Sequence, residues 1–548
     1  MSFDDQIARW GVPPEPIKLK AGMVAFLNER VGKLHPSPQA GRTNVEVPDS
    51  RISEGVLSEF QSALSAESVT TDADARLAHS GGFSYLDIVA RRGVEPKVAD
   101  AVIFPTSKED VVKLLALAEQ YRLAVVPFGG GTSVVGGVRA DAEVSENSDG
   151  FNGILAVAFD KFADLVGIND VDMTVTVQPG MTGPALERLL NPRGLTLGHF
   201  PQSWERASIG GYAATRSSGQ ASSGYGRSNE MIESLTVVTP RGEFDLGIAP
   251  GTAAGPDLRQ VFIGSEGAFG FITSITLRIR RLPEVTRYEG IMFPTYESAL
   301  AAFRELKQAQ VKTAVLRLSD PQETATNLTM AVEGRTATAL NKYLEVRKVA
   351  GGCLAIVSWE GTSAQVKADR SQTWTVFKKH RGVSLGRKVG DGWEHARYSG
   401  PYLRDVLMDQ GLLVETLETA TRWSNMENLR NRVYQALTDS LRAGNPDAPG
   451  PHIMSHLSHV YDTGGSLYVT VVAEVEADDP VGQWERAKQA ACQAIVEAGA
   501  TITHHHAVGR DHAPFLAEEI GESGVELLRS IKAQVDPAGI MNPGVLVS

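Results

Sequence analysis

The chain has 548 residues, 42% of them hydrophobic and 22% charged, and a net charge of −12 at pH 7. This length predicts two or more globular domains, and the negative charge argues against a nucleic-acid-binding protein. The two cysteines exclude a disulfide framework, and no apolar run approaches the roughly 20 residues that span a bilayer. We expect a cytoplasmic protein, with a peripheral membrane contact left open.

The N-terminal part alternates short helical patterns with polar loops, and residues 35–44 (HPSPQAGRTN) are typical of an exposed linker. Strand and helix patterns follow one another from Ala99 onward. The expected elements are a strand, a Ser/Asp-capped helix and a second strand within 99–131, strands at 153–160 and 174–180, a helix at 182–194, and strands within 234–246 and 271–282.

Beyond residue 284 the pattern changes to longer helices that alternate with strands, such as the helices expected at 296–309 and 484–499. This change predicts a second α+β domain built on a different plan. The expected division is 1–95, a helical and loop segment; 96–283, the first large domain; 284–500, a cap; and 501–548, a C-terminal segment.

Three loops rich in glycine and small hydroxyl residues punctuate the first large domain, at 127–137 (PFGGGTSVVGG), 207–226 and 262–273. Glycine lets a backbone turn its N–H groups toward a phosphate. The first loop is neither a Walker loop nor a Rossmann fingerprint, and a plain tight turn is its alternative explanation. Three such loops at separate strand ends indicate one large dinucleotide.

Three consecutive histidines, His504, His505 and His506, lie in TITHHHAVGR (501–510). Imidazole changes its protonation near neutral pH, so the run is a candidate for proton transfer. If the segment is extended, His504 and His506 face one side and His505 the other. A surface or subunit-contact cluster is the alternative, and a zinc site is disfavoured because contiguous histidines lack the usual ligand spacing.

PFGGGTSV, GGYAATRSSGQASSGYG (210–226) and GSEGAFGFIT (264–273) resemble the flavin-binding domain of the vanillyl-alcohol oxidase superfamily. Together with GHFPQS (198–203), THHHAVG (503–509) and VDPAGIMNPGVL (535–546), the chain resembles the alkyl-dihydroxyacetonephosphate synthase family. The resemblance implies an α+β fold with a two-subdomain PCMH-type FAD-binding domain over 96–283, an α+β cap over 284–500 and a histidine-bearing C-terminal segment.

The resemblance also implies FAD, with its pyrophosphate against Gly129–Ser133. We expect non-covalent binding, because residues 127–138 contain no histidine that could tether the flavin. The predicted cofactor residues are Pro127, Gly129, Gly130, Gly131, Thr132, Ser133, Pro201, Ser203, Ser208, Gly210, Gly211, Ala214, Thr215, Ser218, Gly219, Glu266, Gly267, Gly270 and Ile272.

The family's reaction exchanges the acyl chain of acyl-dihydroxyacetone phosphate for a fatty alcohol, without net oxidation. The resemblance assigns proton transfer to His504–His506 and to Tyr468, whose pKa neighbours would lower. It assigns substrate contacts to Arg404, Arg317 and His199, with both guanidinium groups able to pair with phosphate. The expected partners are long-chain acyl-dihydroxyacetone phosphate, a fatty alcohol and a second copy of the chain in a homodimer.

Two other functions stay open. FAD enzymes that oxidise D-2-hydroxy acids share the flavin domain, but carry a GEHG-like segment where this chain has HHHAVG. The 215–219 loop also continues as QASSGYG, without the basic residues of typical synthases. A non-catalytic flavin-binding protein is a weaker alternative, given how many titratable side chains are expected beside the flavin.

Overall fold

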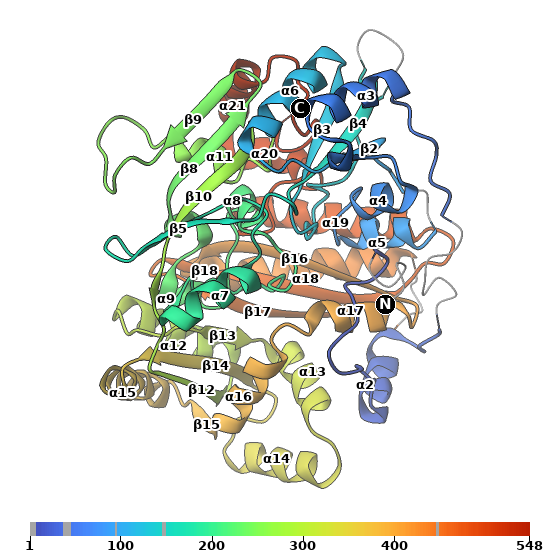
Figure 1. Cartoon of the computed structure of the whole chain (residues 1–548). Coiled ribbons are helices and arrows are strands. Elements are labelled where there is room, and N and C mark those ends of the chain that lie inside the picture. The colour runs from blue at the N-terminus through green and yellow to red at the C-terminus, as the bar shows by residue number, and fades with distance from the viewer. Residues whose placement is uncertain (1–6, 37–44, 94–95, 145–149, 445–448, 548) are drawn as a thin grey trace.

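The computed structural model describes residues 7–36, 45–93, 96–144, 150–444 and 449–547. Most of the predicted linker at 35–44 lies outside the described residues. Two smaller sheets carry the glycine-rich loops at the top of Figure 1, and a broad sheet crosses the middle and lower part of the molecule.

The first sheet has the strand order β1 (Val69–Thr70), β2 (Ala101–Ile103), β4 (Gly153–Ala158), β3 (Leu123–Phe128). The predicted strand–helix–strand unit is confirmed by β2, α6 (Lys108–Gln120) and β3. The Ser107 side chain accepts the Asp110 N–H and begins α6. β2 and β3 run parallel to β4, so the first glycine loop starts where the buried strand β3 ends.

The second sheet is antiparallel and has the order β5 (Leu165–Asn169), β6 (Thr174–Val177), β10 (Phe271–Arg278), β8 (Ile232–Thr239), β9 (Gly242–Leu246). Apolar side chains of β6, β8 and β10 form one core with α7 (Gly183–Leu190) and α8 (Ile209–Thr215). The second glycine loop leads into and out of α8, and the third lies between α11 (Arg259–Phe262) and β10.

The broad sheet is also antiparallel. Its strand order is β15 (Val383–Gly386), β12 (Val285–Phe293), β14 (Cys353–Gly361), β13 (Leu316–Ser319), β17 (His452–Val460), β18 (Gly464–Glu474), β16 (Leu412–Arg422). The helices that accompany it are α12 (Tyr296–Gln308), α13 (Pro321–Ala331), α14 (Gly334–Val346), α15 (Ser363–Lys379), α16 (Arg387–Ala396), α17 (Gly400–Met408), α18 (Met426–Gly444) and α19 (Pro480–Glu497).

Several short helices complete the described chain. They are α2 (Ala21–Val31), α3 (Glu54–Ala63), α4 (Ala73–Ala78), α5 (Tyr85–Arg91), α9 (Ser222–Tyr225), α10 (Ser228–Met231), α20 (Leu516–Ile520) and α21 (Glu522–Val535). After α21 the chain returns to the first sheet, where Val125 donates its N–H to Ile540 and accepts from Asn542, each at 2.8 Å. The C-terminal segment therefore connects the cap to the first glycine loop.

Candidate active site

The histidine triplet lies in a bent segment between α19 and α20. Its three N–H groups all turn toward Glu418, whose Oε1 accepts from His504 at 2.9 Å, His505 at 2.8 Å and His506 at 2.7 Å. The segment is therefore not extended, and the alternation expected of an extended segment does not apply. Successive residues of a strand point to opposite sides, so consecutive N–H groups can share one acceptor only if the backbone curves around it.

Glu418 lies on β16 with only 1% of its surface exposed. Burial opposes its ionisation, but the neighbouring histidines, His505 foremost, hold the pKa of the carboxyl well below its usual value. The Thr503 hydroxyl also donates to Oε1, at 2.6 Å. Glu418 is therefore a buried carboxylate that fixes the path of the histidine segment.

Burial lowers the pKa of His506 to about 3 and that of His504 well below its usual value. Both rings are consequently neutral at pH 7. Tyr461 Oη lies 2.6 Å from His504 Nε2, and His504 Nδ1 lies 3.0 Å from His505 Nδ1. His506 Nδ1 is buried and has no hydrogen-bond partner in the described chain. No group of the described chain therefore uses its capacity to accept a proton.

Three neighbouring strands place His456, Tyr468 and Glu418 side by side, because Tyr468 of β18 pairs with His456 of β17 and with Glu418 of β16. The His456 and Tyr468 rings stack with their centroids 4.8 Å apart, and the Tyr468 ring lies 5.5 Å from that of His506. Burial raises the pKa of Tyr468 to about 12, so the expected lowering is wrong. At neutral pH this phenol is a proton donor.

Arg317 is held in a buried ion pair with Glu323. Its two terminal nitrogens lie 2.9 and 3.2 Å from the Glu323 carboxylate, and Nη2 is 2.9 Å from His456 Nδ1. Burial opposes ionisation of Glu323, but Arg317 and His456 together lower the pKa of its carboxyl. The guanidinium that was expected to meet phosphate is thus engaged by protein groups.

Arg404 is less fully engaged. Its Nη1 donates to the Phe83 carbonyl at 2.6 Å, Nη2 is 3.5 Å from Asp405, and its buried Nε has no partner in the described chain. Its charge reaches Tyr468, whose pKa it lowers slightly against the effect of burial. Arg404 therefore lies near the row of cap side chains that faces the histidines.

His199 lies within the flavin-domain loops, and His505 adds to the effect of burial in lowering its pKa. It is buried, its Nε2 is 3.1 Å from Ser217 Oγ, and its ring packs edge-on against Tyr212 with centroids 4.7 Å apart. Burial lowers the pKa of His199 to about 3, so the ring is neutral. Its Nδ1 has no partner in the described chain.

The first glycine loop packs closely on the second. A Cβ on Gly129 would lie 2.4 Å from Ser208 Oγ, and one on Gly130 would lie 2.1 Å from the Arg206 carbonyl oxygen. Within the described chain, no backbone carbonyl accepts the N–H groups of residues 129–133. A row of free donors held by glycines is what a pyrophosphate requires, so the loop fits FAD.

The other two loops meet around Glu266, a buried residue with a positive φ of 51°. The N–H groups of Gly264 and Glu266 donate to the carbonyls of Ala213 and Ala214, each at 3.0 Å. Glu266 Oε2 accepts the N–H of Gly509 at 2.8 Å, which joins this loop to the histidine segment.

Asn542 completes the junction by donating to the carbonyls of Gly137 at 2.9 Å and Glu266 at 2.7 Å. The remaining predicted cofactor residues lie on these same loops or at their ends. They are Pro127 at the end of β3, Gly131, Thr132 and Ser133 in the first loop, Pro201 and Ser203 before α8, Gly210, Gly211 and Thr215 in α8, Ser218 and Gly219 after it, Gly267 and Gly270 before β10, and Ile272 in β10.

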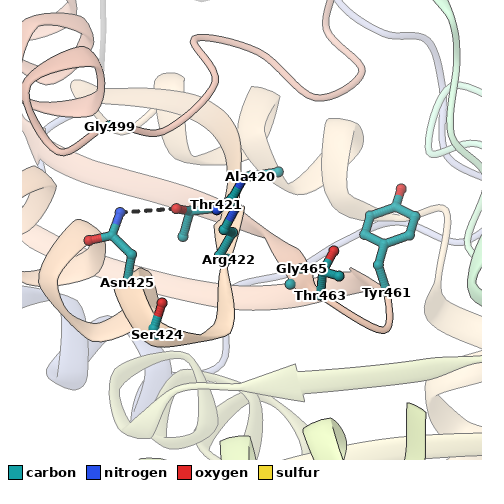
Figure 2. A pocket seen from close by; sticks show the side chains of 10 residues that line it. Ala420, Thr421, Arg422, Ser424, Asn425, Tyr461, Thr463, Gly465 and Gly499 are labelled. Atoms are coloured by element: carbon teal, nitrogen blue, oxygen red, sulfur yellow. Dashed lines mark hydrogen bonds between the residues drawn. The ribbon is translucent and has the colours of Figure 1, made fainter. Parts of the chain in front are cut away.

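A pocket of about 460 Å³ opens at the end of β16 and the β17–β18 turn (Figure 2). Its lining is Ala420, Thr421, Arg422, Ser424, Asn425, Tyr461, Thr463, Gly464, Gly465 and Gly499. Asn425 donates to the Thr421 hydroxyl at 3.0 Å on one side of it. Through Tyr461 the pocket adjoins His504, since the Tyr461 hydroxyl reaches that ring.

Sequence reasoning did not place Glu418, Tyr461 or Arg227, whose guanidinium donates to the His504 carbonyl. It did not place His456 or His459 either. The sequence around Glu418 could have identified it, since acidic residues rarely occur inside an apolar strand such as LLVETLETATR unless they are paired. No local sequence pattern identifies Tyr461 or Arg227, because their contacts depend on chain segments that meet only in the fold.

Residues 99–245 match the family described as "FAD binding domain", and residues 282–546 match "FAD linked oxidases, C-terminal domain". An alkyldihydroxyacetonephosphate synthase of Trypanosoma brucei brucei is 31% identical over 528 residues, which cover 94% of this chain and 84% of the relative. A solved structure of an alkyldihydroxyacetonephosphate synthase has a TM-score of 0.80 at 27% identity, covering 95% of this chain and 92% of that one.

A probable mitochondrial D-lactate dehydrogenase of Danio rerio is 27% identical over 508 residues, or 90% of this chain and 91% of the relative. The alternative function expected from the sequence thus has relatives as well, at lower identity. Together the matches confirm the predicted α+β fold class and FAD as the cofactor.

Proposed function

The chain belongs to the alkyldihydroxyacetonephosphate synthase family of FAD-linked enzymes, and we propose that it exchanges the acyl chain of acyl-dihydroxyacetone phosphate for a fatty alcohol. The observation that carries this proposal is the position of the histidine segment. Glu418 of the cap holds the N–H groups of residues 504–506, and Glu266 of the third glycine loop holds that of Gly509. Such an arrangement brings proton-transfer groups beside the flavin-domain loops.

The first glycine loop would hold the FAD pyrophosphate through the free N–H groups of residues 129–133. Binding without a covalent bond is supported by the absence of histidine from residues 127–138. When bound, FAD supplies the electron sink that this exchange needs without net oxidation.

The proton steps fall to neutral side chains. His506 Nδ1, buried and without a protein partner, is the candidate acceptor for a proton from the substrate. Tyr468, whose high pKa keeps it protonated, is the candidate hydrogen-bond donor to the departing carboxylate. The contact between His504 Nδ1 and His505 Nδ1 provides a path along which a proton can move between neighbouring rings.

The phosphate of the substrate needs a cation, and Arg404 is the better of the two predicted arginines. Its Nε has no partner in the described chain, and its charge is felt at Tyr468. Arg317 instead positions His456, and through it the stacked Tyr468 ring, while its own charge is balanced by Glu323.

The substrates carry long apolar tails, so we also propose a peripheral membrane contact and, from the family resemblance, a homodimer. No helix in the described residues is long and apolar enough to cross a membrane. The membrane contact is supported by the exposure of Tyr343 and Val346 on α14, at the lower tip of Figure 1. Vesicle flotation and sedimentation equilibrium test the two proposals separately.

Two assays on the purified flavoprotein test the activity. With palmitoyl-dihydroxyacetone phosphate and hexadecanol, the proposal predicts hexadecyl-dihydroxyacetone phosphate and palmitate in equal amounts, without reduction of a dye. With D-lactate and an electron-accepting dye, it predicts no reduction above background. Dye reduction without ether formation would instead identify a D-2-hydroxyacid dehydrogenase. Failure of both reactions with FAD bound would refute both functions.

A further inference from the structure

We propose that His459, His504 and His505 form a binding site for one divalent transition-metal ion of the zinc class, and that the bound ion blocks synthesis. His459 lies on β17, whereas His504 and His505 belong to the bent segment after α19. One ring nitrogen from each lies within 4.8 Å of the other two. The contiguous histidines alone lack the usual spacing of zinc ligands, but the fold adds a third ligand, His459, from β17.

The ring geometry suits a metal ion. The ring centroid of His459 lies 5.0 Å from that of His504 and 5.2 Å from that of His505. The centroids of His504 and His505 are 5.2 Å apart. Imidazoles that bind one tetrahedral ion at about 2.0–2.1 Å place their centroids roughly 5 Å apart. The Nδ1 atoms of His504 and His505 already lie 3.0 Å from each other. The His459 and His504 rings are nearly parallel, at 19°, so a rotation of one ring would direct both nitrogens to a single ion.

His459 itself points to a missing ligand. It is 3% exposed, and its Nδ1 has no hydrogen-bond partner in the described chain. A buried polar nitrogen without a partner costs free energy, which an ion or another donor would offset.

The surroundings supply negative charge and orientation. Glu418 Oε2 lies 3.3 Å from His505 Nδ1, and the Tyr461 hydroxyl contacts His504 Nε2. Tyr461 leaves His504 Nδ1 to face the ion, as outer hydrogen bonds do in known metal sites. Arg227 opposes binding with its positive charge, which the Glu418 carboxylate offsets. The pocket in Figure 2 is lined by Tyr461, the residue that contacts His504.

Imidazole nitrogen favours Zn²⁺, Cu²⁺ or Ni²⁺, whereas Mg²⁺ and Ca²⁺ prefer oxygen ligands. An ion at this site would occupy His504 and His505 and remove their nitrogens from the proton path. The inhibition, though not the binding, rests on the proposed function.

The test uses flavin-loaded enzyme stripped of metal with a chelator and dialysed against Zn²⁺. Wild type should bind one equivalent, and zinc K-edge spectra should show nitrogen ligands at about 2.0–2.1 Å. His459→Ala should weaken this binding by roughly tenfold or more. His459→Gln serves if the alanine variant does not retain FAD. His395→Ala, which removes an exposed surface histidine, should bind like wild type.

Zinc should also inhibit synthesis by wild type and by His395→Ala, while His459→Ala should resist at the same concentration. Equal zinc affinity in wild type and both His459 variants, or equal binding of Mg²⁺, would overturn the site. Zinc bound through His459 without inhibition would overturn the blocking role alone. Because dialysis measures binding without turnover, the site is still tested if the chain does not make ether lipid.

Discussion

The Glu418 carboxylate accepts the N–H of His506 at 2.7 Å, through the same oxygen that accepts from the two preceding histidines. A backbone wrapped around one buried anion cannot extend into a strand. The positions of all three rings therefore depend on a side chain of the cap sheet. Glu418 also pairs across the sheet with Tyr468. It therefore fixes the position of the three histidines relative to the Tyr468 phenol.

Glu418→Gln is accordingly expected to lower ether synthesis by roughly 100-fold, the scale of acid–base catalysis, while FAD stays bound. The amide would point a donor at N–H groups that need an acceptor, and would remove the charge. The measurement is turnover under saturating substrates, with flavin absorbance as the check on binding. The matched control is Glu415→Gln on the same strand, whose partner is Trp484. If both variants lose activity equally, the loss belongs to the strand and not to Glu418.

Local patterns predicted the elements of the first domain well, because each carries its own signal. Ser107 caps α6, and the apolar run before Gly129 forms β3. The histidine segment was harder. Its sequence is compatible with a strand, and the acceptor that bends it is remote in the chain.

The site was predictable to the extent that family motifs mark it, and less so in its electrostatics. Tyr468 was named from the resemblance, but its pKa depends on burial between β16 and β17, which no local pattern reveals. Arg317 illustrates the same limit. Its pairing with Glu323 joins a strand end to the following helix, and His456 comes from a third element.

Gly130→Val should abolish FAD retention. A Cβ on Gly130 would strike the Arg206 carbonyl, so the first loop would be pushed off the second before any phosphate is met. Flavin content after gel filtration measures the effect. Gly167→Ala, where a Cβ meets nothing within 4 Å, should keep wild-type flavin. Acid denaturation of wild type should release free FAD, and flavin that stays with the polypeptide would contradict non-covalent binding.

Arg404→Ala and Arg317→Ala should separate substrate binding from stability. Loss of a charge-assisted contact at Arg404 should weaken binding of the phosphorylated substrate by about 1.5–3 kcal/mol and raise KM. Loss of Arg317 leaves the buried Glu323 carboxylate without its ion-pair partner. It should lower the free energy of unfolding by about 3–5 kcal/mol. Denaturant titration and steady-state kinetics measure the two effects. A raised KM with unchanged stability in Arg317→Ala would restore it as a substrate ligand.

Glu266 predicts how stability depends on pH. Burial raises the pKa of this carboxyl to about 7 in the folded protein, against the N–H donors of Gly509 and Val508 that favour the charged form. The folded state holds this proton more tightly than the unfolded one. Protonation of Glu266 therefore stabilises the folded state fully below about pH 4.5, and this stabilisation is lost as pH rises through 7. Between pH 5 and 8 the melting temperature of wild type should thus fall relative to that of Glu266→Gln. Parallel curves would refute the raised pKa.

The histidine segment and Tyr468 carry the final prediction. Single replacement of His504, His505 or His506 by alanine should leave FAD bound and reduce ether formation by roughly 100-fold or more. Since the segment curves around Glu418, the middle residue is not turned away, and His505→Ala should lose as much activity as its neighbours. Tyr468→Phe should behave alike, because it removes the donor and keeps the ring stacked on His456. Product formation with hexadecanol measures each loss, with bound flavin as the control. Wild-type turnover in all four variants would remove the basis for the proposed chemistry, whereas a mild effect confined to His505→Ala would show that its ring only supports the other two.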